Sequence, residues 1–326
     1  MRSEGSGVTD SPLFSIVIPT YNRLEFLRQA LSSVWSQTFT DYEVIVVDDG
    51  STDGTTTWLQ TQVERVRVVA QSNRGPGAAR NTGAQNAHGA YVAFLDSDDW
   101  WFPWTLATFA RAIQDYGNPQ ILGGRLIEFE NMRELTDVVE TSYEADQFGD
   151  FIASSHQPLS VGSGTCVVDR NAMLATQFIE DRLNSEDHDL ILRLGTLPGF
   201  IQIRSPITVA WRRHLTTETH NINNGALGAL RLSLCEKSGA YPGGEKRARE
   251  RRRIVARHLR PASLTCLQEG EIGHALELYR ATFVWNLELG HWKYLAGLPI
   301  LMLAAALIRR RSRRADPVAC QAPGPR

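Results

Sequence analysis

Glu43-Val-Ile-Val-Val-Asp-Asp-Gly-Ser-Thr-Asp-Gly54 is the stretch that decides the fold. Its β-branched apolar run, residues 44–47, predicts a buried strand, and the acidic and turn residues after it mark the end of that strand. The pattern recurs three times, so further strands are expected at residues 14–18, 66–69 and 91–95. Segments with helical spacing lie between these runs. The alternation predicts an α/β fold with an open, mostly parallel sheet flanked by helices.

Polar side chains follow each of the four expected strands. They are supplied by Pro19-Thr-Tyr-Asn22, Asp48-Asp-Gly-Ser51, Asn73-Arg-Gly-Pro-Gly77 and Asp96-Ser-Asp-Asp99. Ligands of open α/β sheets bind beyond the carboxyl ends of the strands. We therefore expect the four segments to meet at one ligand-binding edge.

Asp96, Asp98 and Asp99 place three carboxylates at one strand end. Their like charges repel one another and cost stability unless a cation or a set of hydrogen-bond donors compensates. Mg²⁺ or Mn²⁺ suits this position because these cations bind a few carboxylate oxygens together with substrate phosphates. The alternative is an Asp-rich turn that caps the helix after Pro103. The polar ends of the other strands favour the metal.

Asp49 and Arg80 are further candidates for ligand recognition. An acid after the second strand accepts hydrogen bonds from a base or ribose in other nucleotide folds, while Ser51 or Asp53 is expected to supply the helix cap. Arg80 lies one turn into an expected helix rich in Ala and Gly, where an isolated guanidinium points to a carboxylate or a phosphate. A salt bridge to the Asp clusters and a direct contact with a ligand phosphate both remain open.

Composition and charge exclude several classes of protein. The 326 residues are 42% hydrophobic and 21% charged, as expected for one sizeable core and a smaller appended unit. Residues 1–235 hold 17 Lys and Arg against 28 Asp and Glu, whereas residues 236–326 hold 17 against 8. The acidic first part argues against a nucleic-acid-binding face.

The four cysteines are too scattered for a disulfide framework or a zinc site, which favours a reducing cytosol. The polar residues 1–12 are expected to form a disordered tail.

Beyond residue 104 the pattern loosens into a second layer and then a basic, helical region. Strands are expected at residues 121–129, 164–168 and 201–211, and a helix is expected at residues 186–194. The apolar run 295–308 is shorter than the roughly 20 residues that a membrane-spanning helix needs. Because five arginines follow it within residues 309–314, it fits a helix in the interface of an anionic membrane. The alternative is a packing helix or an oligomer contact.

Four segments together resemble the family 2 glycosyltransferases of the GT-A fold in their order and spacing. They are Val17-Ile-Pro-Thr-Tyr-Asn22, Val47-Asp-Asp-Gly-Ser-Thr-Asp53, Asn73-Arg-Gly-Pro-Gly-Ala-Ala-Arg-Asn81 and Phe94-Leu-Asp-Ser-Asp-Asp99. The resemblance is specific over residues 13–110 and weakens toward residue 220. We therefore expect a GT-A domain at residues 13–235 and a helical, basic C-terminal region at residues 236–326.

The resemblance implies an inverting enzyme that uses a nucleotide-sugar donor, and it assigns roles to single residues. In the donor site, Pro19 and Tyr21 would line the nucleotide base and Asp49 would bind the uracil. Asp96 would contact the ribose side of the donor. Asn22 and Arg80 would also belong to the donor site. Asp98 would hold the metal, and His214 would lie near the diphosphate and the metal, in a late Trp211-Arg-Arg-His214 signature. Asp187, in Ser185-Glu-Asp-His188, would be the general base.

Glu186 and Asp187 open the helix expected at residues 186–194. Adjacent side chains on a helix differ by roughly 100° in direction, so only one of these carboxylates can face an acceptor. One such carboxylate is what a general base requires. The alternative is that both acids complement the helix dipole at its start. For His214, the alternative is a histidine that is hydrogen-bonded or solvent-exposed and has no role in the site.

These expectations describe a transferase that moves a sugar from a nucleotide diphosphate, with UDP expected, to a hydroxyl of a glycan or lipid-linked acceptor. Mg²⁺ or Mn²⁺ is the expected cofactor, and cell-surface polysaccharide or glycan synthesis is the expected setting. The protein is expected in the cytoplasm, peripheral on the inner face of the cell membrane. Two alternatives remain: a catalytically silent nucleotide-sugar-binding protein and another nucleotide-sugar enzyme. A nucleotidyltransferase would be expected to carry a basic, Gly-rich loop after the first strand, which residues 19–22 are not.

Overall fold

The computed structural model describes residues 11–157, 159, 161–214 and 221–315, and within them an eight-stranded sheet is the centre of the fold. The strand order is β3-β2-β1-β4-β9-β6-β10-β8. In that order the bounds are Arg67–Ala70, Tyr42–Asp48, Phe14–Thr20, Tyr91–Phe94, Cys166–Asp169, Ile121–Gly123, Phe200–Ser205 and Glu144–Phe148. Strands β1 to β4 pair in parallel, whereas β9 and β8 run antiparallel to their neighbours. The predicted α/β fold with a mostly parallel sheet is confirmed.

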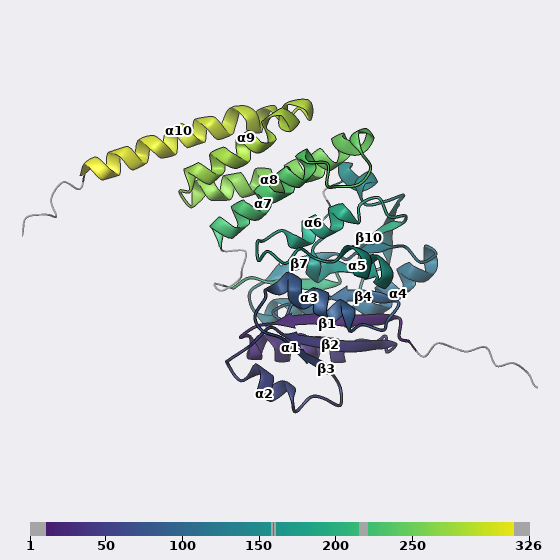
Figure 1. Cartoon of the computed structure of the whole chain (residues 1–326). Helices are drawn as coiled ribbons and strands as arrows, with labels where there is room; N and C mark the ends of the chain where they lie inside the picture. The colour runs from purple at the N-terminus through teal and green to yellow at the C-terminus, as the bar shows by residue number, and fades with distance from the viewer. Residues whose placement is uncertain (1–10, 158, 160, 215–220, 316–326) are drawn as a thin grey trace, which may run out of the picture.

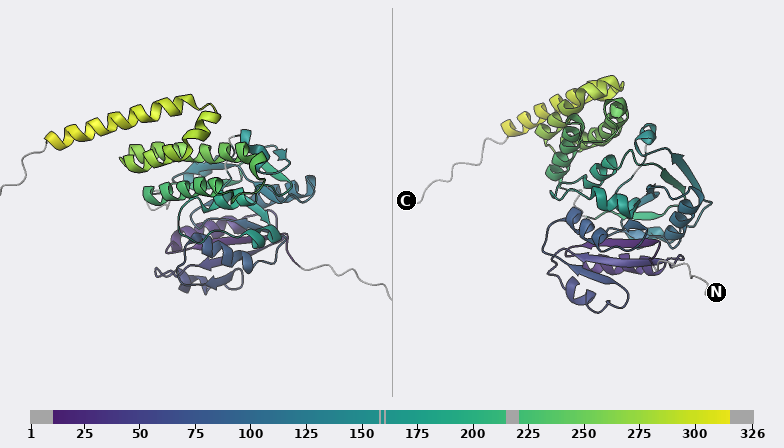
Figure 2. Two further views of the ribbon diagram at one scale, coloured as in Figure 1. Left: turned by 45° about the horizontal axis from the view of Figure 1, so that its top comes forward. Right: turned by 45° about the vertical axis from the view of Figure 1, so that its right-hand side comes forward.

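Both faces of the parallel strands are buried, which is why their sequences are continuous apolar runs rather than alternating ones. Along β1, Ile16 and Ile18 pack on one face and Val17 on the other. The first face is covered by α1 (Leu24–Trp35), α2 (Thr55–Leu59) and α4 (Thr105–Asp115). The second face is covered by α3 (Pro76–Gln85), α5 (Arg170–Thr176) and α6 (Glu186–Arg193). Figures 1 and 2 show this layered arrangement.

The prediction of a single strand at residues 121–129 is wrong, because the chain leaves the main sheet partway along this segment. Residues Ile121–Gly123 form β6, whereas Leu126–Phe129 form β7 in a second sheet of order β5-β11-β7. Between them, a Cβ on Gly124 would lie 2.4 Å from Thr208 Oγ1, so only glycine fits this crossing. The region expected at 201–211 is two strands, β10 and β11 (Val209–Arg212), and the latter pairs with β5 (Trp100–Trp101) and β7.

Short 3-10 helices connect several of these elements. They are η1 (Met132–Leu135), η2 (Ile152–His156), η3 (Ser163–Thr165) and η5 (Glu245–Arg247). Of these, η3 directly precedes β9 in the centre of the sheet. It therefore places a short loop at the start of β9, beside the end of β4 where the predicted site lies.

The C-terminal region is helical, as predicted, and it packs against α6 and η2, on the side of the second face of the sheet (Figure 1). Its helices are α7 (Ile222–Lys237), α8 (Ala248–Gln268), α9 (Ile272–Glu288) and α10 (Trp292–Ala315). Apolar residues of α7, α8 and α9 belong to the same buried cluster as Val17 of β1 and Leu190 of α6. Helix α7 runs across residue 235, and the domain boundary predicted there stays a prediction. The disordered tail predicted at residues 1–12 also stays a prediction, since residues 1–10 lie outside the described residues.

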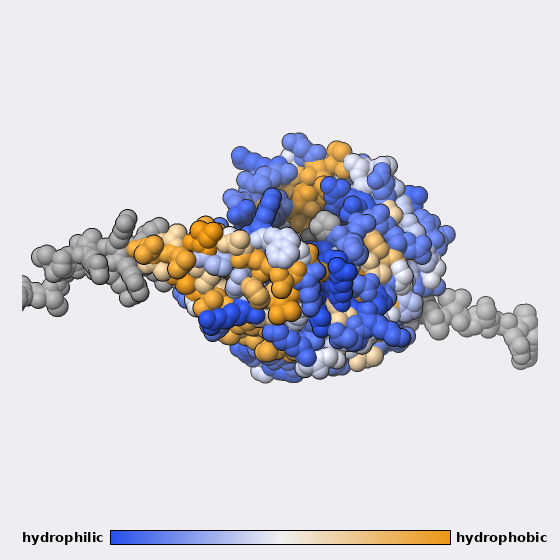
Figure 3. Space-filling model, turned by 90° about the horizontal axis from the view of Figure 1, so that it is seen from above, coloured by the Kyte–Doolittle hydropathy of each residue, from blue (hydrophilic) through white to orange (hydrophobic). Residues whose placement is uncertain are grey.

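Helix α10 carries one buried and one exposed apolar face. Leu298 and Met302 are buried against the neighbouring helices, whereas Ile300, Leu303 and Leu307 are at least 60% exposed. Figure 3 shows apolar side chains gathered over the C-terminal helices. Among the described residues, no helix is long and apolar enough to span a membrane. The arginines at residues 309–314 lie outside the part of the chain whose side chains are described.

A buried ion pair fixes α8 to α7. The Arg251 guanidinium donates to both carboxylate oxygens of Glu236, at 2.7 and 3.2 Å, and both side chains are at most 3% exposed. Arg251 also donates to the carbonyl oxygens of Pro242 and Gly244. Removing one partner of such a pair strongly destabilises the fold, because the charge of the other partner stays buried without compensation.

Arg251→Met is expected to lower the free energy of unfolding by about 3 kcal/mol, since Glu236 keeps only the Arg252 guanidinium at 3.6 Å. Urea unfolding followed by circular dichroism measures this change. Arg249→Met on the same helix is the control, because Arg249 is exposed and its loss should change stability by less than about 0.5 kcal/mol. Equal effects of the two substitutions would contradict the structural role of the pair.

Candidate functional site

The loops after β1 and β2 interlock and form one wall of a groove. Asn22 has a φ of 52°, and its Oδ1 accepts a hydrogen bond from the Thr52 N–H at 2.7 Å. In return, the Asn22 N–H donates to Ser51 Oγ at 2.9 Å. The groove, of about 560 Å³, is lined by residues 21–26 and Asp53. Tyr21 lies in it with 46% of its surface exposed, so a ring face is available to a ligand, whereas Pro19 is buried in β1.

Asp49 is buried and holds the loop after β3. One carboxylate oxygen accepts from Gln71 Nε2 at 2.7 Å and from the Arg74 N–H at 2.8 Å, and the other accepts from the Gly75 N–H at 2.8 Å. The predicted contact of Asp49 with a base is not tested by these bonds. The helix cap expected from Ser51 or Asp53 is wrong, because the N-cap of α2 is Gly54 and has no side-chain cap. Asp53 instead accepts from the N–H groups of Thr55 and Leu24, the first residues of α2 and α1.

Arg80 joins the sheet edge to helix α6. Its guanidinium is buried and lies 2.7 Å from Asp96 Oδ1 and 2.7 Å from Glu186 Oε1, over the ring of Phe178. Burial opposes the charge, but the two carboxylates outweigh it and raise the pKa of Arg80. The salt bridge that the sequence left open is therefore present. A donor contact by Arg80 stays a prediction.

The Asp cluster is held by side chains from other parts of the chain. Asp98 Oδ2 accepts from His214 Nε2 at 2.8 Å and also pairs with Arg23. Asp99 accepts from the Arg212 N–H at 3.0 Å, and burial, followed by the charges of Asp98 and Asp96, raises its pKa. The alternative that these acids cap the helix after Pro103 is wrong, because the residue before α4, Trp104, makes no side-chain cap.

Arg23, Phe26 and Arg212 belong to this cluster, although the sequence interpretation assigned them no role. Phe26 stacks on His214, with ring centroids 4.8 Å apart, and the Arg212 guanidinium lies over Phe26 at 5.1 Å. Arg212 Nε also donates to the Asp98 carbonyl oxygen at 2.8 Å. The signal for Arg212 was its place inside the 211–214 signature. For Arg23 and Phe26 the only signal was their position just after a polar strand end.

The two acids at the start of α6 point in different directions, as the helix geometry predicted. Glu186 pairs with Arg80, whereas Asp187 Oδ1 accepts from both the backbone N–H and Nδ1 of His188, at 2.7 and 2.8 Å. Burial disfavours the charged form of Asp187, but the neighbouring His188 outweighs burial and holds the pKa of this carboxyl below its usual range. Asp187 is thus ionised at neutral pH, as a base must be.

A glycine loop that the sequence interpretation did not select lies against these carboxylates. A Cβ built on Gly162 would lie 2.9 Å from Asp187 Oδ2, and one on Gly164 would lie 3.0 Å from Asp99 Oδ2 and 3.7 Å from Asp96 Oδ2. The alternation of glycines in Val161-Gly-Ser-Gly-Thr165 was the available signal. This loop and Arg80 bring the acids after β4 and the acids of α6 into one site.

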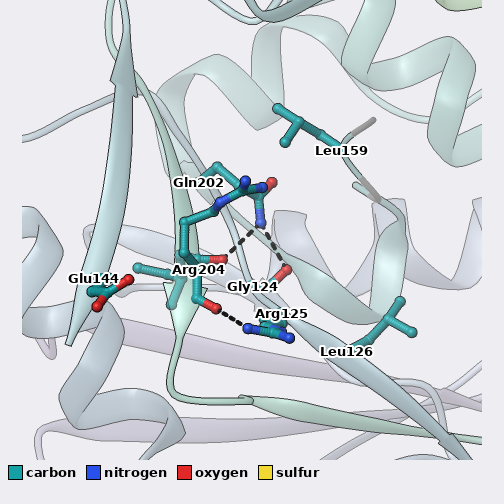
Figure 4. Close-up of a pocket in the computed structure, with 8 residues that line it drawn as sticks. Gly124, Arg125, Leu126, Glu144, Leu159, Gln202 and Arg204 are labelled. Carbon is teal, nitrogen blue, oxygen red and sulfur yellow. Dashed lines mark hydrogen bonds between the residues drawn. The ribbon is translucent and has the colours of Figure 1, made fainter. Parts of the chain in front are cut away.

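A second cavity, of about 440 Å³, is lined by none of these acids (Figure 4). It is lined by residues of β8, β10 and the β6–β7 turn, where Arg125 Nη1 donates to the Arg204 carbonyl oxygen at 2.7 Å. Gln202 Nε2 donates to the Gly124 carbonyl oxygen at 3.0 Å. The described lining of this cavity includes none of the site residues predicted from the sequence.

Similarity to known proteins covers both the sequence and the fold. Residues 15–174 match the family model described as Glycosyl transferase family 2. A chondroitin synthase from Escherichia coli is 30% identical over 235 residues, which cover 68% of this chain and 32% of that protein. The crystal structure of S. aureus TarS 1-349 in complex with UDP-GlcNAc has a TM-score of 0.65 at 19% identity, covering 93% of this chain and 91% of that chain.

A mannosyltransferase from Pyrobaculum calidifontis, in complex with GDP-Man and Mn²⁺, has a TM-score of 0.51 at 18% identity and covers 92% of this chain and 87% of that chain. Structural likeness at these identities shows the fold alone. The matched segments span 13–37% of the length of the curated relatives. Through residues 15–174, this chain belongs to glycosyl transferase family 2.

Proposed function

We propose that the protein is an inverting glycosyltransferase that moves a sugar from a UDP-sugar to a hydroxyl of a glycan or lipid-linked acceptor. One observation carries the proposal: Asp187 Oδ2 and the acids after β4 lie against the same glycine loop. An ionised carboxylate is thereby held next to the edge of the sheet where a nucleotide ligand is expected. The UDP-GlcNAc bound by the related TarS fold supports the choice of donor.

The residues of the site divide into donor binding and proton removal. The exposed ring of Tyr21 lines the groove together with Asn22 and suits stacking on the base. Pro19 and Asp49 are buried, and we assign them to the same base-binding region without a place in the groove lining. Asp187 removes the proton of the acceptor hydroxyl, whose oxygen forms a bond to the anomeric carbon as the bond from that carbon to the diphosphate breaks. The electron pair leaves with the diphosphate. A single base suffices because this leaving group needs no proton.

A divalent cation, Mg²⁺ or Mn²⁺, fits the acids after β4. Asp98 and His214 would hold it, with Asp96 near the ribose, and their carboxylate and imidazole atoms suit such a cation. In the described residues no three His, Cys, Asp or Glu side chains converge as a full metal cage. Two protein ligands plus donor phosphates match the coordination that Mg²⁺ prefers. When bound, the cation would neutralise charge on the departing diphosphate.

A catalytically silent nucleotide-sugar-binding protein is the second candidate function. It shares every donor contact and differs in the absence of transfer. The position of the Asp187 carboxylate, against the glycine loop that also contacts the acids after β4, favours the enzyme. Slow release of UDP from a UDP-sugar in the presence of Mn²⁺ separates the two candidates.

We place the protein on the cytoplasmic face of an anionic membrane, attached through α9 and α10. Exposed apolar side chains on these helices include Val284, Trp292, Ile300 and Leu303. Residues 236–326 carry a net charge of +9, from 17 Lys and Arg against 8 Asp and Glu, which complements anionic headgroups. An acceptor carried by a lipid would be reached from such a surface, as expected for cell-surface polysaccharide synthesis.

Asp187→Asn is expected to keep UDP-sugar affinity and to lower transfer by roughly 10²-fold or more, because a positioned base typically contributes 10²–10⁴ in rate. Calorimetry measures donor binding, and UDP release measures turnover. Glu186→Gln is the control, since its amide oxygen can still accept a hydrogen bond from Arg80. If Glu186→Gln is the inactive variant and Asp187→Asn the active one, the assignment of the base is wrong.

Asp98→Asn is expected to weaken Mn²⁺-dependent binding of UDP by roughly 10- to 100-fold, because it removes a charged metal ligand while preserving the shape of the side chain. Titration calorimetry with Mn²⁺ and with EDTA measures the difference. Asp115→Asn, at an exposed acid of α4, is the matched control and should bind as the unmodified chain does. An Asp98→Asn variant with full Mn²⁺-dependent affinity would exclude Asp98 as a ligand.

Replacing Ile300, Leu303 and Leu307 together by Gln is expected to reduce binding to anionic vesicles several-fold, because these side chains are exposed and would be buried in the interface. Vesicle flotation with anionic and zwitterionic lipids measures attachment, and high salt should weaken it. Val63→Gln, at an exposed apolar side chain near α2, is the control. Unchanged flotation of the triple variant would make α10 a packing helix instead.

A further inference from the structure

A histidine from the C-terminal helices contacts the segment that carries the proposed base. His258 lies on α8, and its Nε2 is 2.8 Å from Ser185 Oγ. Its ring also packs on that of His188, with centroids 4.1 Å apart and planes inclined by 39°. His258 therefore touches both residues that flank Glu186 and Asp187.

Ser185 is in a backbone conformation that needs support. Its φ of 67° and ψ of 21° lie in the left-handed region, which is unfavourable for a residue with a side chain. Such a conformation persists when surrounding contacts fix it. The bond between Ser185 Oγ and His258 Nε2 is such a contact, and it sits directly before the first turn of α6.

His258 also limits the protons that the segment can hold. His188 faces Asp187 and Glu186, and although burial opposes its charge, Asp187 raises its pKa. Burial and then the charge of His188 lower the pKa of His258 to about 3, with Asp187 opposing. The positive charge of the pair is therefore favoured on His188, next to Asp187, while His258 stays neutral.

Helix α8 is itself held firmly against α6 and η2. Val255 and Leu259 are buried in the cluster that contains Leu190 of α6. The Arg257 guanidinium donates to the carbonyl oxygens of Ser155 and Gln157, in and just after η2. A side chain on α8 is thus held from two directions.

We propose that His258 is a positioning residue for glycosyl transfer, which fixes the Ser185–His188 turn so that Asp187 keeps its orientation toward the glycine loop. The active site then includes the C-terminal helices and does not end at residue 235. The proposal rests on the proposed function, since it takes Asp187 as the base. His258 touches no reacting atom and acts through Ser185 and His188.

The test uses the full chain with His258→Phe, His258→Gln and, as control, Ser263→Ala. Phe keeps a ring against His188 but cannot bond to Ser185 Oγ, whereas the Gln amide can. We expect His258→Phe to lower kcat roughly 10- to 100-fold with unchanged affinity for UDP-sugar, because a misplaced catalytic group loses rate rather than donor binding. His258→Gln should recover most of this rate. Ser263→Ala, on the same helix, loses a contact with Tyr294 and should turn over normally.

The pH dependence of stability gives an independent readout. An unfolded chain protonates His258 near its ordinary pKa of about 6.5, whereas the folded chain does so only near 3. The unfolded state therefore binds more protons between these values, and the contribution of a neutral His258 to stability is lost as pH falls through this window. The stability difference between the unmodified chain and His258→Gln should accordingly shrink from pH 7 to pH 4.

The outcomes separate the two proposals. An Asp187→Asn variant with the full rate of transfer overturns the assignment of Asp187 as the base, and this inference with it, whereas an unmodified chain that binds UDP-sugar without transfer overturns the proposed function. If Asp187→Asn is inactive while both His258 variants turn over as Ser263→Ala does, only the positioning role is wrong. Equal losses of rate and of stability in the Phe and Gln variants would also overturn it, since they would mark His258 as a packing residue.

Discussion

The site depends on the buried ion pairs that the Arg80 guanidinium forms with two carboxylates. This guanidinium lies between Asp96, at the end of the parallel strand β4, and Glu186, at the start of α6, with 2.7 Å to each carboxylate. A buried cation without an anionic partner costs several kcal/mol, so the two acids and Arg80 must assemble together. Since Asp96 and Glu186 are far apart in the sequence, this requirement joins the parallel half of the sheet to the helix that carries Asp187.

Charge compensation extends from Arg80 over the rest of the site. Asp98 is matched by Arg23 and His214, and the backbone N–H of Arg212 donates to Asp99. The acids after β4 are therefore kept close together by contacts within the chain. Electrostatic preorganisation of this kind is what the proposed binding of a charged donor requires.

The C-terminal helices are part of the same folded unit as the sheet. Residues of α7, α8 and α9 share one buried cluster with β1, β2 and α6. The polar contacts of α8 with the Ser185–His188 turn follow from this packing, because the shared core fixes the helix close to α6. A change in these helices is therefore transmitted to the position of α6 through direct contacts rather than through a flexible linker.

The sequence by itself determined the four parallel strands and the polar residues that follow them, because β-branched runs and turn residues are local signals that survive in any compact fold. It also placed Glu186 and Asp187 on different sides of a helix. It did not determine which residue contacts which carboxylate: His214 reaches Asp98 across 116 residues, and Gly162 and Gly164 reach acids of two separate motifs. Nor did it divide residues 121–129 into two sheets, since that depends on the close approach of Gly124 to Thr208. Only the tertiary structure decided these pairings, because they arise from packing between distant segments, which no local pattern encodes.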